Sequence, residues 1–456
     1  MSYNEQTKHI VVYGLGQSGL SAARYFQRIE QDFYAVDSRE NPPGKDELQA
    51  IACCKQSWFG DVPQEILNQA SQIILSPGVA KETPAIVEAA KAGAEVIGDV
   101  ELFVRETKGK IIAITGSNGK STVTELTHKL LVAAGVNAQI GGNFGVPVLD
   151  YLPEDAGDYY VLELSSFQLD TTQSLRAEIA VILNITEDHM DRYADFNAYK
   201  QSKLSIYNGA KNIIANYDDE LTFPEKSDRY KVFSLHEQTA DYHLNYQNDS
   251  AELVIDNQGI IDVSKLMLSG SHNWSNALVA IGIVKQVAGE IDKNVLSALT
   301  SYQGLPHRFQ LVKSDEGIDW INDSKATNVG ATQAAINAID LKIYGCIVLI
   351  AGGDAKGSDL SPLSSSFERV THFILIGRDA PMFRKIIIDN KVTMATTLQD
   401  AIDKSYNFIK SCHQNVSGKA MVLLSPACAS FDMFDNYMDR GNKFAEAVNQ
   451  LGRSAL

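Results

Sequence analysis

The segment Thr115–Thr122 (Thr-Gly-Ser-Asn-Gly-Lys-Ser-Thr) carries the residue types that bind nucleotide phosphates. Glycines let backbone N–H groups turn toward a phosphate, and a helix that begins at the loop adds positive potential. Lys120 supplies a mobile cation, and the Ser121 hydroxyl suits Mg²⁺. The two glycines are separated by two residues, whereas the strict Walker pattern has four. We therefore predict a nucleotide-phosphate loop; the alternative is a tight turn with an exposed lysine.

Two acidic segments follow apolar runs further along the chain. Glu163 comes directly after Tyr159–Leu162, and a carboxylate one strand beyond a phosphate loop suits Mg²⁺ coordination. The alternative is an exposed glutamate at a strand end. The segment Asn184–Asp191 places three acidic residues around His189. It predicts a metal ligand or an acid–base group, or alternatively a capping cluster for the next helix.

The first glycine-rich turn, Gly14-x-Gly16-x-x-Gly19, follows an apolar strand and opens a helix. Asp37 stands at the end of the next strand, where dinucleotide-binding folds place an acidic residue on a ribose hydroxyl. Three interpretations remain open at this point. The turn binds NAD or FAD, it binds another nucleotide-bearing ligand, or its glycines serve only helix–sheet packing.

Other polar residues give weaker signals. Lys203 lies in a helical stretch, Tyr199–Tyr207, and composition alone favours a surface lysine. Asn273 and Asn276 share one helix face, where amides can contact a base edge or cap the helix. Cys428 has no histidine nearby in sequence to activate it, so a small buried residue is favoured over a nucleophile. Four polar loops near the C-terminus are also candidate ligand contacts: His307–Phe309, Asn322–Asn328, Gly352–Lys356 and Ser425–Asp432.

Short apolar runs alternate with longer segments of helical period, which predicts parallel sheets covered by helices. At about 150 residues per domain, the 456 residues suggest three domains. We place them at 1–98, 99–304 and 305–456. The expected strands are Ile10–Tyr13, Phe33–Val36, Ile73–Leu75, Glu95–Ile97, Lys110–Ile114, Tyr159–Leu162, Ile179–Leu183, Ile213–Ala215, Cys346–Ile350, Phe373–Ile376 and Met421–Leu424.

Composition excludes several classes of protein. Forty basic and 56 acidic residues give a net charge of −16, which opposes general nucleic-acid binding. The five cysteines form no Cys-x-x-Cys pair, so we expect neither a zinc site nor a disulfide framework. This cysteine usage favours a protein of the reducing cytosol. Met1–His9 does not resemble a signal peptide, and no apolar run reaches 18 residues, so we expect no membrane span.

Taken together, the motifs resemble the Mur ligase family. The resemblance extends from Gly14 to about Gly441. It implies three α/β domains: a Rossmann-like N-terminal domain, a central P-loop-type ATPase with a mostly parallel sheet, and a Rossmann-like C-terminal domain. The segments that carry it are Thr115–Thr122, Glu163–Phe167, Asn184–Asp191, Gly304–Phe309, Asn322–Asn328 and Ser425–Asp432.

The resemblance also implies an ATP-dependent amide ligase that proceeds through an acyl phosphate. Ser425–Asp432, Gly14–Gly19 and Ser76–Gly78 favour addition of D-glutamate to UDP-N-acetylmuramoyl-L-alanine. The first glycine-rich turn would then receive a UDP-sugar diphosphate. By matching position, uridine and diphosphate would be held by Ser18, Asp37, Ser38, Arg39 and Gly78, the sugar-peptide end by Asn143, and D-glutamate by Thr327, Lys356, Ser430 and Tyr437. Tyr437 stands where we expect phenylalanine, so its hydroxyl alters that pocket.

ATP, two Mg²⁺ ions and a carbamylated lysine are the cofactors that the resemblance implies. Lys203 matches the lysine that CO₂ carbamylates, which reverses the surface interpretation. His189 is a candidate for proton transfer, and Lys120, His189 and Lys203 are the candidate catalytic residues. ATP would contact Gly116, Asn118, Gly119, Lys120, Ser121, Thr122, Asn276, Arg308 and Asp323, and Mg²⁺ would be held through Ser121, Glu163, His189 and Lys203.

Three rival functions remain at this point. One is a ligase of the same architecture with another amino acid, such as a folylpolyglutamate synthase. The second is a nicotinamide-dependent dehydrogenase, which leaves Thr115–Thr122 and Asn184–Asp191 unexplained. The third is a nucleotide-binding module without catalysis. We expect a cytoplasmic monomer that binds small-molecule substrates.

Overall fold

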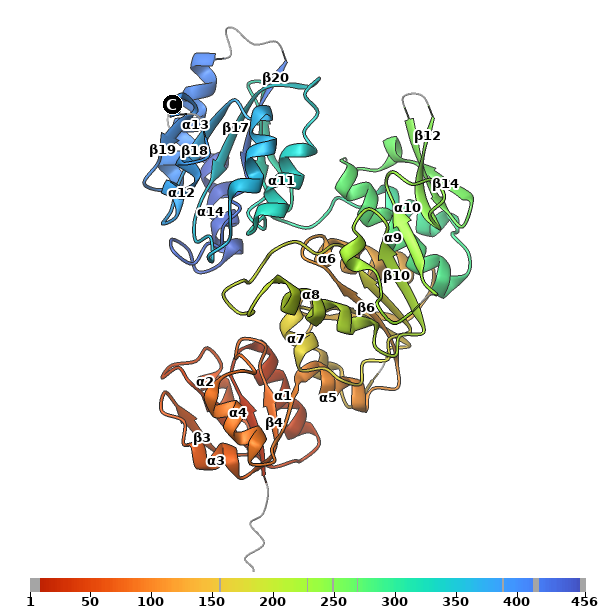
Figure 1. The fold of residues 1–456 in the computed structure, drawn as a ribbon, viewed down its shortest axis with the longest axis vertical. Helices are drawn as coiled ribbons and strands as arrows, with labels where there is room; N and C mark the ends of the chain where they lie inside the picture. The colour runs from red at the N-terminus through yellow and green to blue at the C-terminus, as the bar shows by residue number, and fades with distance from the viewer. Residues whose placement is uncertain are drawn as a thin grey trace, which may run out of the picture. The chain divides into compact units, whose positions relative to one another are not determined.

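The computed structural model describes residues 9–451 except 156, 228, 248–249, 269, 388 and 413–417. The sequence prediction that Met1–His9 is not a signal peptide falls mostly outside these residues. The side chain of Cys412 also lies outside them. Figure 1 labels the helices and strands along the chain. The chain divides into two compact units. The first comprises Met1–Ile185, Asn197–Lys265 and Ser275–Ser301, and the second comprises Thr186–Phe196, Leu266–Trp274 and Tyr302–Leu456.

The first sheet has five strands, all parallel, in the order β3-β2-β1-β4-β5. The chain order reverses between β1 and β4, the place where open α/β sheets bind ligands. The four strands predicted here are confirmed; β3 is additional. Its elements are β1 (His9–Tyr13), α1 (Gln17–Arg28), β2 (Phe33–Asp37), α2 (Lys45–Leu48), β3 (Cys54–Phe59), α3 (Gln64–Asn68), β4 (Ala70–Leu75), α4 (Pro84–Lys91) and β5 (Glu95–Gly98).

The second sheet has nine strands, in the order β14-β13-β12-β11-β10-β9-β6-β8-β7. Only the β12–β13 and β13–β14 pairings are antiparallel. Its strands are β6 (Lys110–Thr115), β7 (Ala138–Gly142), β8 (Tyr159–Glu163), β9 (Ile179–Ile182), β10 (Asn212–Asn216), β11 (Lys231–Ser234), β12 (Tyr242–Gln247), β13 (Ser250–Ile255) and β14 (Gln258–Asp262). Its helices are α5 (Asp99–Glu106), α6 (Lys120–Ala133), η1 (Val148–Tyr151), α7 (Ser166–Asp170), α8 (Phe196–Leu204), η2 (Ser205–Tyr207), η3 (Glu220–Thr222), η4 (Val263–Lys265), α9 (Ser271–Ala288) and α10 (Lys293–Thr300).

Strand β6 lies between β8 and β9, and this position gathers the candidate site. Ile114 of β6 pairs with Glu163 of β8, and Thr115 pairs with Ile182 of β9. The three strands are parallel, so their carboxyl ends share one edge. The loop after β6, the end of β8 and Asn184 after β9 therefore meet there.

The third sheet has six strands, in the order β15-β16-β20-β17-β18-β19, and only β15 is antiparallel to its neighbour. Three sheets, two of them wholly or mostly parallel and Rossmann-like, agree with the α/β class predicted from the sequence. Its elements are β15 (Gln310–Asp315), β16 (Ile318–Asn322), α11 (Val329–Asn337), β17 (Tyr344–Ala351), η5 (Ser361–Arg369), β18 (His372–Leu375), α12 (Ala380–Arg384), η6 (Asp389–Lys391), β19 (Val392–Met394), α13 (Leu398–Cys412), β20 (Lys419–Leu424) and α14 (Tyr437–Gln450).

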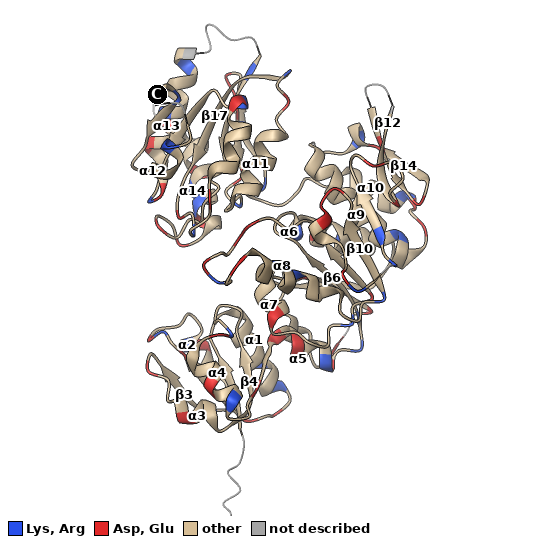
Figure 2. Cartoon of the chain, in the orientation of Figure 1, with Lys and Arg blue, Asp and Glu red and all other residues tan. Residues whose placement is uncertain are grey.

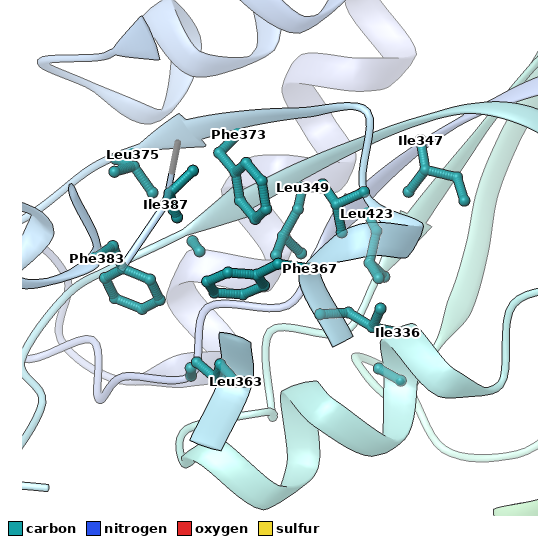
Figure 3. Packing of buried hydrophobic residues seen from close by; sticks show 14 of the residues in the cluster. Ile336, Ile347, Leu349, Leu363, Phe367, Phe373, Leu375, Phe383, Ile387 and Leu423 are labelled. Carbon is teal, nitrogen blue, oxygen red and sulfur yellow. The ribbon is translucent and has the colours of Figure 1, made fainter. Parts of the chain in front are cut away.

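Alternate residues of the third sheet face two separate cores, as the two-residue period of a strand requires. Leu349 and Phe373 pack with residues of α11, η5 and α12 on one face (Figure 3). Val348 and Ile374 pack with residues of α13 and α14 on the other face. Within the first core, the rings of Phe367 and Phe373 meet edge-on at 4.7 Å between centroids. Helices therefore cover both faces of the third sheet, and polar groups for ligand binding are available in the loops at the strand ends.

In the first unit, side chains join the first sheet region to the second. Arg24 donates to both carboxylate oxygens of Asp150, at 2.9 and 2.6 Å. Arg28 donates to the carbonyls of Leu152 and Leu149, at 2.6 and 2.5 Å. A bidentate arginine–carboxylate pair adds directional specificity. These contacts explain why two sheets belong to one compact unit.

Glu101 holds α5 against the loop after α7 and is expected to make stability depend on acid pH. It is 1% exposed and accepts the N–H groups of Gln173 and Ser174 at 2.7 and 2.9 Å. Burial raises its pKa, but these hydrogen bonds and Arg105 outweigh burial and lower the pKa below its ordinary 4.5. The stabilisation is therefore present above about pH 4.5 and lost as pH falls through the lower, folded-state pKa.

Urea unfolding at pH 7 and pH 4 measures this effect. Glu101→Gln is expected to lower the free energy of unfolding by about 1–3 kcal/mol at pH 7, with a smaller loss at pH 4. Glu125→Gln serves as the control, because Glu125 pairs along α6 with half-exposed Lys129 at 3.1 Å, and such helix-surface pairs contribute little to stability. Equal losses for Glu101→Gln at both pH values would contradict the expectation.

The described residues include no helix with both the length and the apolar character needed to cross a bilayer. Lys and Arg residues are scattered among Asp and Glu residues along the chain (Figure 2).

Candidate active site

The phosphate loop predicted from Thr115–Thr122 connects β6 directly to α6. Gly116 and Gly119 have φ angles of +156° and +84°. A Cβ atom on Gly119 would lie 2.8 Å from Oδ1 of Asn276, and one on Gly116 would lie 3.0 Å from Cβ of Leu183. The loop therefore needs both glycines, and Asn276, a predicted ATP contact, lies against it. The predicted strand–loop–helix geometry is confirmed.

Gly119→Ala is expected to weaken ATP binding and lower stability, because it combines backbone strain with the contact to Asn276. Gly135→Ala is the matched control: Gly135 has φ +79°, but no atom lies within 4 Å of its ideal Cβ position. Left-handed strain alone costs about 1–2 kcal/mol. Calorimetric titration with Mg-ATP should show weaker binding for Gly119→Ala and unchanged binding for Gly135→Ala. Equal ATP affinities in the two variants would contradict this role of Gly119.

Two lysines converge on one carbonyl of the loop. Lys120 Nζ donates to Gly116 O at 2.7 Å and to Ser117 O at 2.9 Å. Lys203 Nζ, from α8, donates to the same Gly116 O at 3.0 Å and lies 4.8 Å from the Tyr199 ring centroid. Lys203 is only 2% exposed, so the interpretation of a surface lysine is wrong.

Ser121, Glu163 and Asn143 form a hydrogen-bonded group at the other side of the loop. Ser121 Oγ donates to Glu163 Oε2 at 2.5 Å, and Asn143 Nδ2 donates to Glu163 Oε1 at 2.6 Å. Glu163 is 2% exposed and ends β8, so it is not an exposed strand-end glutamate. The group joins a predicted metal ligand to the residue predicted for the sugar-peptide end.

The donor atoms near the loop fit Mg²⁺. A serine hydroxyl and a carboxylate are hard oxygen ligands, and Mg²⁺ commonly uses one or two carboxylates together with substrate phosphates. Within the described ranges, no three His, Cys, Asp or Glu side chains gather as a metal cluster. Ser121, Glu163 and Lys203 belong to the first compact unit, whereas His189 belongs to the second. His189 has a φ of +57°, and its Nε2 lies 3.7 Å from Asp188.

In the first sheet, the predicted uridine and diphosphate contacts follow the adjacent strands β1, β2 and β4. Asp37 is 2% exposed, and its carboxylate accepts the N–H of Leu15 at 2.7 Å and the Nε of Arg39 at 2.8 Å. Burial raises the pKa of Asp37, but Arg39 and the backbone donors lower it overall. Asp37 thus orders the glycine-rich turn itself. Ser18 is half-buried, and Ser38 and Gly78 are exposed near the same edge.

The second compact unit contains the four residues predicted for the amino acid: Thr327, Lys356, Ser430 and Tyr437. Lys356 Nζ donates to Asp188 Oδ1 at 2.7 Å, and Asn328 Nδ2 donates to Asp188 Oδ2 at 3.1 Å. Burial raises the pKa of Asp188, but Lys356 and His189 outweigh it and lower the pKa to about 2. Asp188 lies in the predicted acidic segment Asn184–Asp191 but is not among the site residues predicted from the sequence. Ser430 follows β20 and is 2% exposed.

Tyr437 begins α14, and its ring stacks beneath a cation. Lys325 Nζ lies 3.9 Å from the centroid of the Tyr437 ring. Lys325 belongs to the same strand-end loop as half-buried Thr327. A cation over an aromatic face is attracted by the ring quadrupole. The predicted Thr327 and Tyr437 positions are thus connected through Lys325.

Asp323 follows β16 and is almost completely buried. It accepts from Ser425 Oγ at 2.8 Å and from the Phe309 N–H at 3.1 Å. Burial raises its pKa to about 7, although those donors, Arg308 and Arg440 oppose the rise. Arg308 and Asp323, both predicted ATP contacts, are therefore electrostatic neighbours.

Arg440 is a buried residue that sequence reasoning missed. It is 1% exposed, and its guanidinium donates to Ser324 O at 2.7 Å and to Cys428 O at 3.2 Å. A single arginine in an amphipathic helix gives no signal that distinguishes it from a surface residue. Cys428 is fully buried, and burial raises the pKa of its thiol to about 12. The interpretation of Cys428 as a small buried residue is confirmed.

Three family profiles match the chain in succession. "Mur ligase MurD-like, N-terminal domain" matches residues 8–98, "Mur ligase middle domain" matches residues 114–284, and "Mur ligase, glutamate ligase domain" matches residues 307–428. The second profile contains the phosphate loop, Glu163 and Lys203. The third contains Asp323 and Lys356.

Individual relatives extend the match over the whole chain. The UDP-N-acetylmuramoylalanine--D-glutamate ligase of Escherichia coli (strain K12) is 42% identical over 452 residues, covering 98% of this chain and 99% of that protein. The enzyme of the same name from Hahella chejuensis is 42% identical over 456 residues, covering 99% and 100%. The structure of MurF ligase from Thermotoga maritima in complex with ADP superposes with a TM-score of 0.61 at 15% identity, covering 100% of both chains. With the loop geometry, the three profiles and these full-length relatives, the chain belongs to the Mur ligase family.

Proposed function

We propose that this chain is an ATP-dependent ligase that adds D-glutamate to UDP-N-acetylmuramoyl-L-alanine in peptidoglycan precursor synthesis. The observation that carries the proposal is the loop after β6. Two lysines and the Ser121–Glu163 pair surround it there. The near full-length relatives named for this reaction support the choice of substrates.

Each domain has its own task in this proposal. Residues 1–98 bind the UDP part through Ser18, Asp37, Ser38, Arg39 and Gly78, and Asn143 contacts the sugar-peptide end. Residues 99–304 bind ATP through Gly116, Asn118, Gly119, Lys120, Ser121, Thr122 and Asn276. Residues 305–456 contribute Arg308 and Asp323 to ATP and bind D-glutamate through Thr327, Lys356, Ser430 and Tyr437.

The residue types follow from the chemistry. The carboxylate of the L-alanyl group attacks the γ-phosphate of ATP, so two anions must approach one another. Lys120 reduces that repulsion and stabilises the charge that develops during transfer. The transfer breaks the bond between the β- and γ-phosphates, so it yields an acyl phosphate and ADP. The neutral amine of D-glutamate then attacks the acyl carbon, and the amide and inorganic phosphate are released. His189 is the candidate acceptor for the amine proton.

Ser121, Glu163, His189 and a carbamylated Lys203 would hold two Mg²⁺ ions. Bound Mg²⁺ supplies charge neutralisation at the phosphate oxygens. Carbamylation forms a bond between Nζ of the neutral amine and the carbon of CO₂, with loss of one proton. It converts a cation into an anion that supports a metal. Burial of Lys203 beside Gly116 O supports this assignment, because a buried position shields the carbamate from water.

An amino-acid panel tests the function. Phosphate release is measured with ATP, Mg²⁺ and UDP-N-acetylmuramoyl-L-alanine, and with D-Glu, L-Glu, L-Lys or meso-diaminopimelate in turn. Of the four amino acids, we expect only D-Glu to support phosphate release. We expect no phosphate release when the UDP substrate is omitted. Preference for another amino acid would assign a related ligase. NAD binding without ATP binding would instead assign a dehydrogenase.

We also infer that the enzyme acts as a monomer in the cytoplasm. The proposed substrates support the cytoplasmic location, since ATP and UDP-linked precursors are cytoplasmic metabolites. Light scattering on the purified chain measures the first point: a mass near 49.9 kDa is expected, and twice that mass would contradict it.

A further inference from the structure

Three loops at the carboxyl edge of the third sheet are held together around Lys356. The backbones of Asp354 and Ala429 exchange two hydrogen bonds, at 2.9 and 2.8 Å. The Asp379 N–H donates to Gly353 O at 2.9 Å. These bonds connect the loops that follow β17, β18 and β20. A Cβ atom on Gly353 would lie 2.3 Å from Ala429 O, so the loops approach too closely for any side chain there.

Asp354 sets the backbone conformation of Lys356. Its Oδ1 accepts the Lys356 N–H at 2.9 Å. Lys356 has a φ of +52°, which a residue with a side chain rarely adopts. A carboxylate that hydrogen-bonds two residues ahead stabilises this kind of turn. The turn aims the ammonium group, which reaches Asp188 at 2.7 Å.

Arg378 connects the same carboxylate to the two other loops. Its guanidinium lies 2.5 Å from Asp354 Oδ1 and 3.6 Å from Asp379 Oδ2. The backbone N–H of Arg378 donates to Asp432 Oδ2 at 2.8 Å. Asp379 Oδ2 in turn accepts the Ala355 N–H at 2.8 Å. Three carboxylates thus accept backbone N–H groups of these loops: Asp354 that of Lys356, Asp379 that of Ala355 and Asp432 that of Arg378. Their negative charges would repel an anionic amino acid, and Arg378 is the cation placed among them.

We propose that Asp354 and Arg378 are positioning residues that determine affinity for an anionic amino acid. Asp354 holds Lys356 in its binding conformation, and Arg378 neutralises the carboxylates that brace the three loops. The inference rests on the proposed function, since it takes Lys356 as a contact of D-glutamate. Neither residue belongs to the set predicted from the sequence. Asp354 lies in Gly352–Lys356, a polar loop that the sequence predicts only as a candidate ligand contact.

The test compares steady-state constants for D-glutamate, ATP and the UDP substrate in four variants. Asp354→Ala is expected to raise KM for D-glutamate about ten- to a hundredfold, the range for losing a hydrogen bond to a charged group. Asp354→Asn retains an oxygen for the Lys356 N–H and should lose less. Arg378→Ala should also raise this KM, with partial recovery in Arg378→Lys and a weaker effect at high salt. The KM values for ATP and the UDP substrate should stay within about twofold.

Asp400→Ala is the matched control. Asp400 likewise accepts a backbone N–H, from Thr396 at 2.9 Å, and pairs with Lys404 at 2.8 Å, but it lies on α13. Its KM for D-glutamate should not change. A general structural role of Asp354 would raise all three KM values together, or lower the melting temperature without changing the KM for D-glutamate. Either result would overturn the proposal.

Lys356→Ala separates failure of this inference from failure of the proposed function. If wild type uses D-glutamate and Lys356→Ala raises its KM, an unchanged KM in Asp354→Ala and Arg378→Ala overturns only the positioning roles. If Lys356→Ala leaves the KM for D-glutamate unchanged, the amino-acid site is wrongly assigned, and the inference fails with it. If wild type does not use D-glutamate at all, the proposed function itself is wrong.

Discussion

Lys120→Ala is expected to lower kcat for phosphate release by about a hundred- to a thousandfold, equivalent to about 3–4 kcal/mol of transition-state stabilisation. Lys120 begins α6, and its ammonium lies against Gly116 O and Ser117 O within the phosphate loop. No other side chain on that turn of α6 is cationic. Steady-state phosphate release with D-glutamate, ATP and the UDP substrate measures the loss.

The same helix offers a matched control for Lys120. Lys129 pairs with Glu125 on the exposed face of α6, and Lys129→Ala should leave kcat within about twofold. Lys120→Arg should recover little, because a planar guanidinium does not replace a compact ammonium at a tight loop. Near-normal turnover of Lys120→Ala would contradict the assignment of the phosphate loop, and the proposed reaction would then be contradicted as well.

Lys203→Ala is expected to lower kcat/KM by about ten- to a hundredfold, the range seen when a group that supports a metal ligand is removed. The wild-type enzyme should also lose activity in buffer stripped of CO₂ and regain it when bicarbonate is added. The physical reason is that a buried amine 3.0 Å from Gly116 O can support Mg²⁺ only after conversion to an anion. Phosphate release measures both effects.

A direct signal for the carbamate keeps this prediction testable even if Lys203→Ala folds poorly. Carbon-13 NMR with labelled bicarbonate should show one carbamate carbon in the wild type that is missing from the variant. Lys200→Ala is the control, since Lys200 lies on the same helix and pairs loosely with Glu225 at 3.8 Å. Activity that is indifferent to CO₂, together with no carbamate signal, would leave Lys203 as an uncharged or cationic structural residue.

The sequence predicted most strands that are buried on both faces, but not β16, whose apolar residues are interrupted by Asp319 and Asn322. Strands such as β6 and β17 are continuous apolar runs, because helices cover both sides of a parallel sheet. Their observed ends differ from the predicted ends by about one or two residues. Several strands at the edges of the sheets lack a continuous apolar run and were not predicted. In β3, at the edge of the first sheet, Lys55 and Gln56 are exposed. The β12–β14 hairpins at the edge of the second sheet were missed in the same way.

The candidate site was predictable to different degrees for different residues. Asn184 lies against the phosphate loop, since its side chain accepts the Asn118 N–H at 2.8 Å, but nothing local to either segment indicates this pairing. Composition favoured an exposed Lys203, and only the family resemblance opposed that interpretation. The sequence places Asp188 in an acidic cluster, but its partner Lys356 is 168 residues away. Arg440 gave no signal at all.

The amino-acid order alone was enough to specify the glycine-dependent bend after β6, because its glycines, lysine and serine act within eight consecutive residues. Burial and long-range pairing depend instead on which strands become neighbours. Lys203 meets Gly116 across 87 residues because α8 packs beside the carboxyl end of β6. Asp354 and Ala429 meet because β17 and β20 are adjacent in the third sheet. Such contacts form only when the whole chain has folded, so local sequence patterns do not predict them.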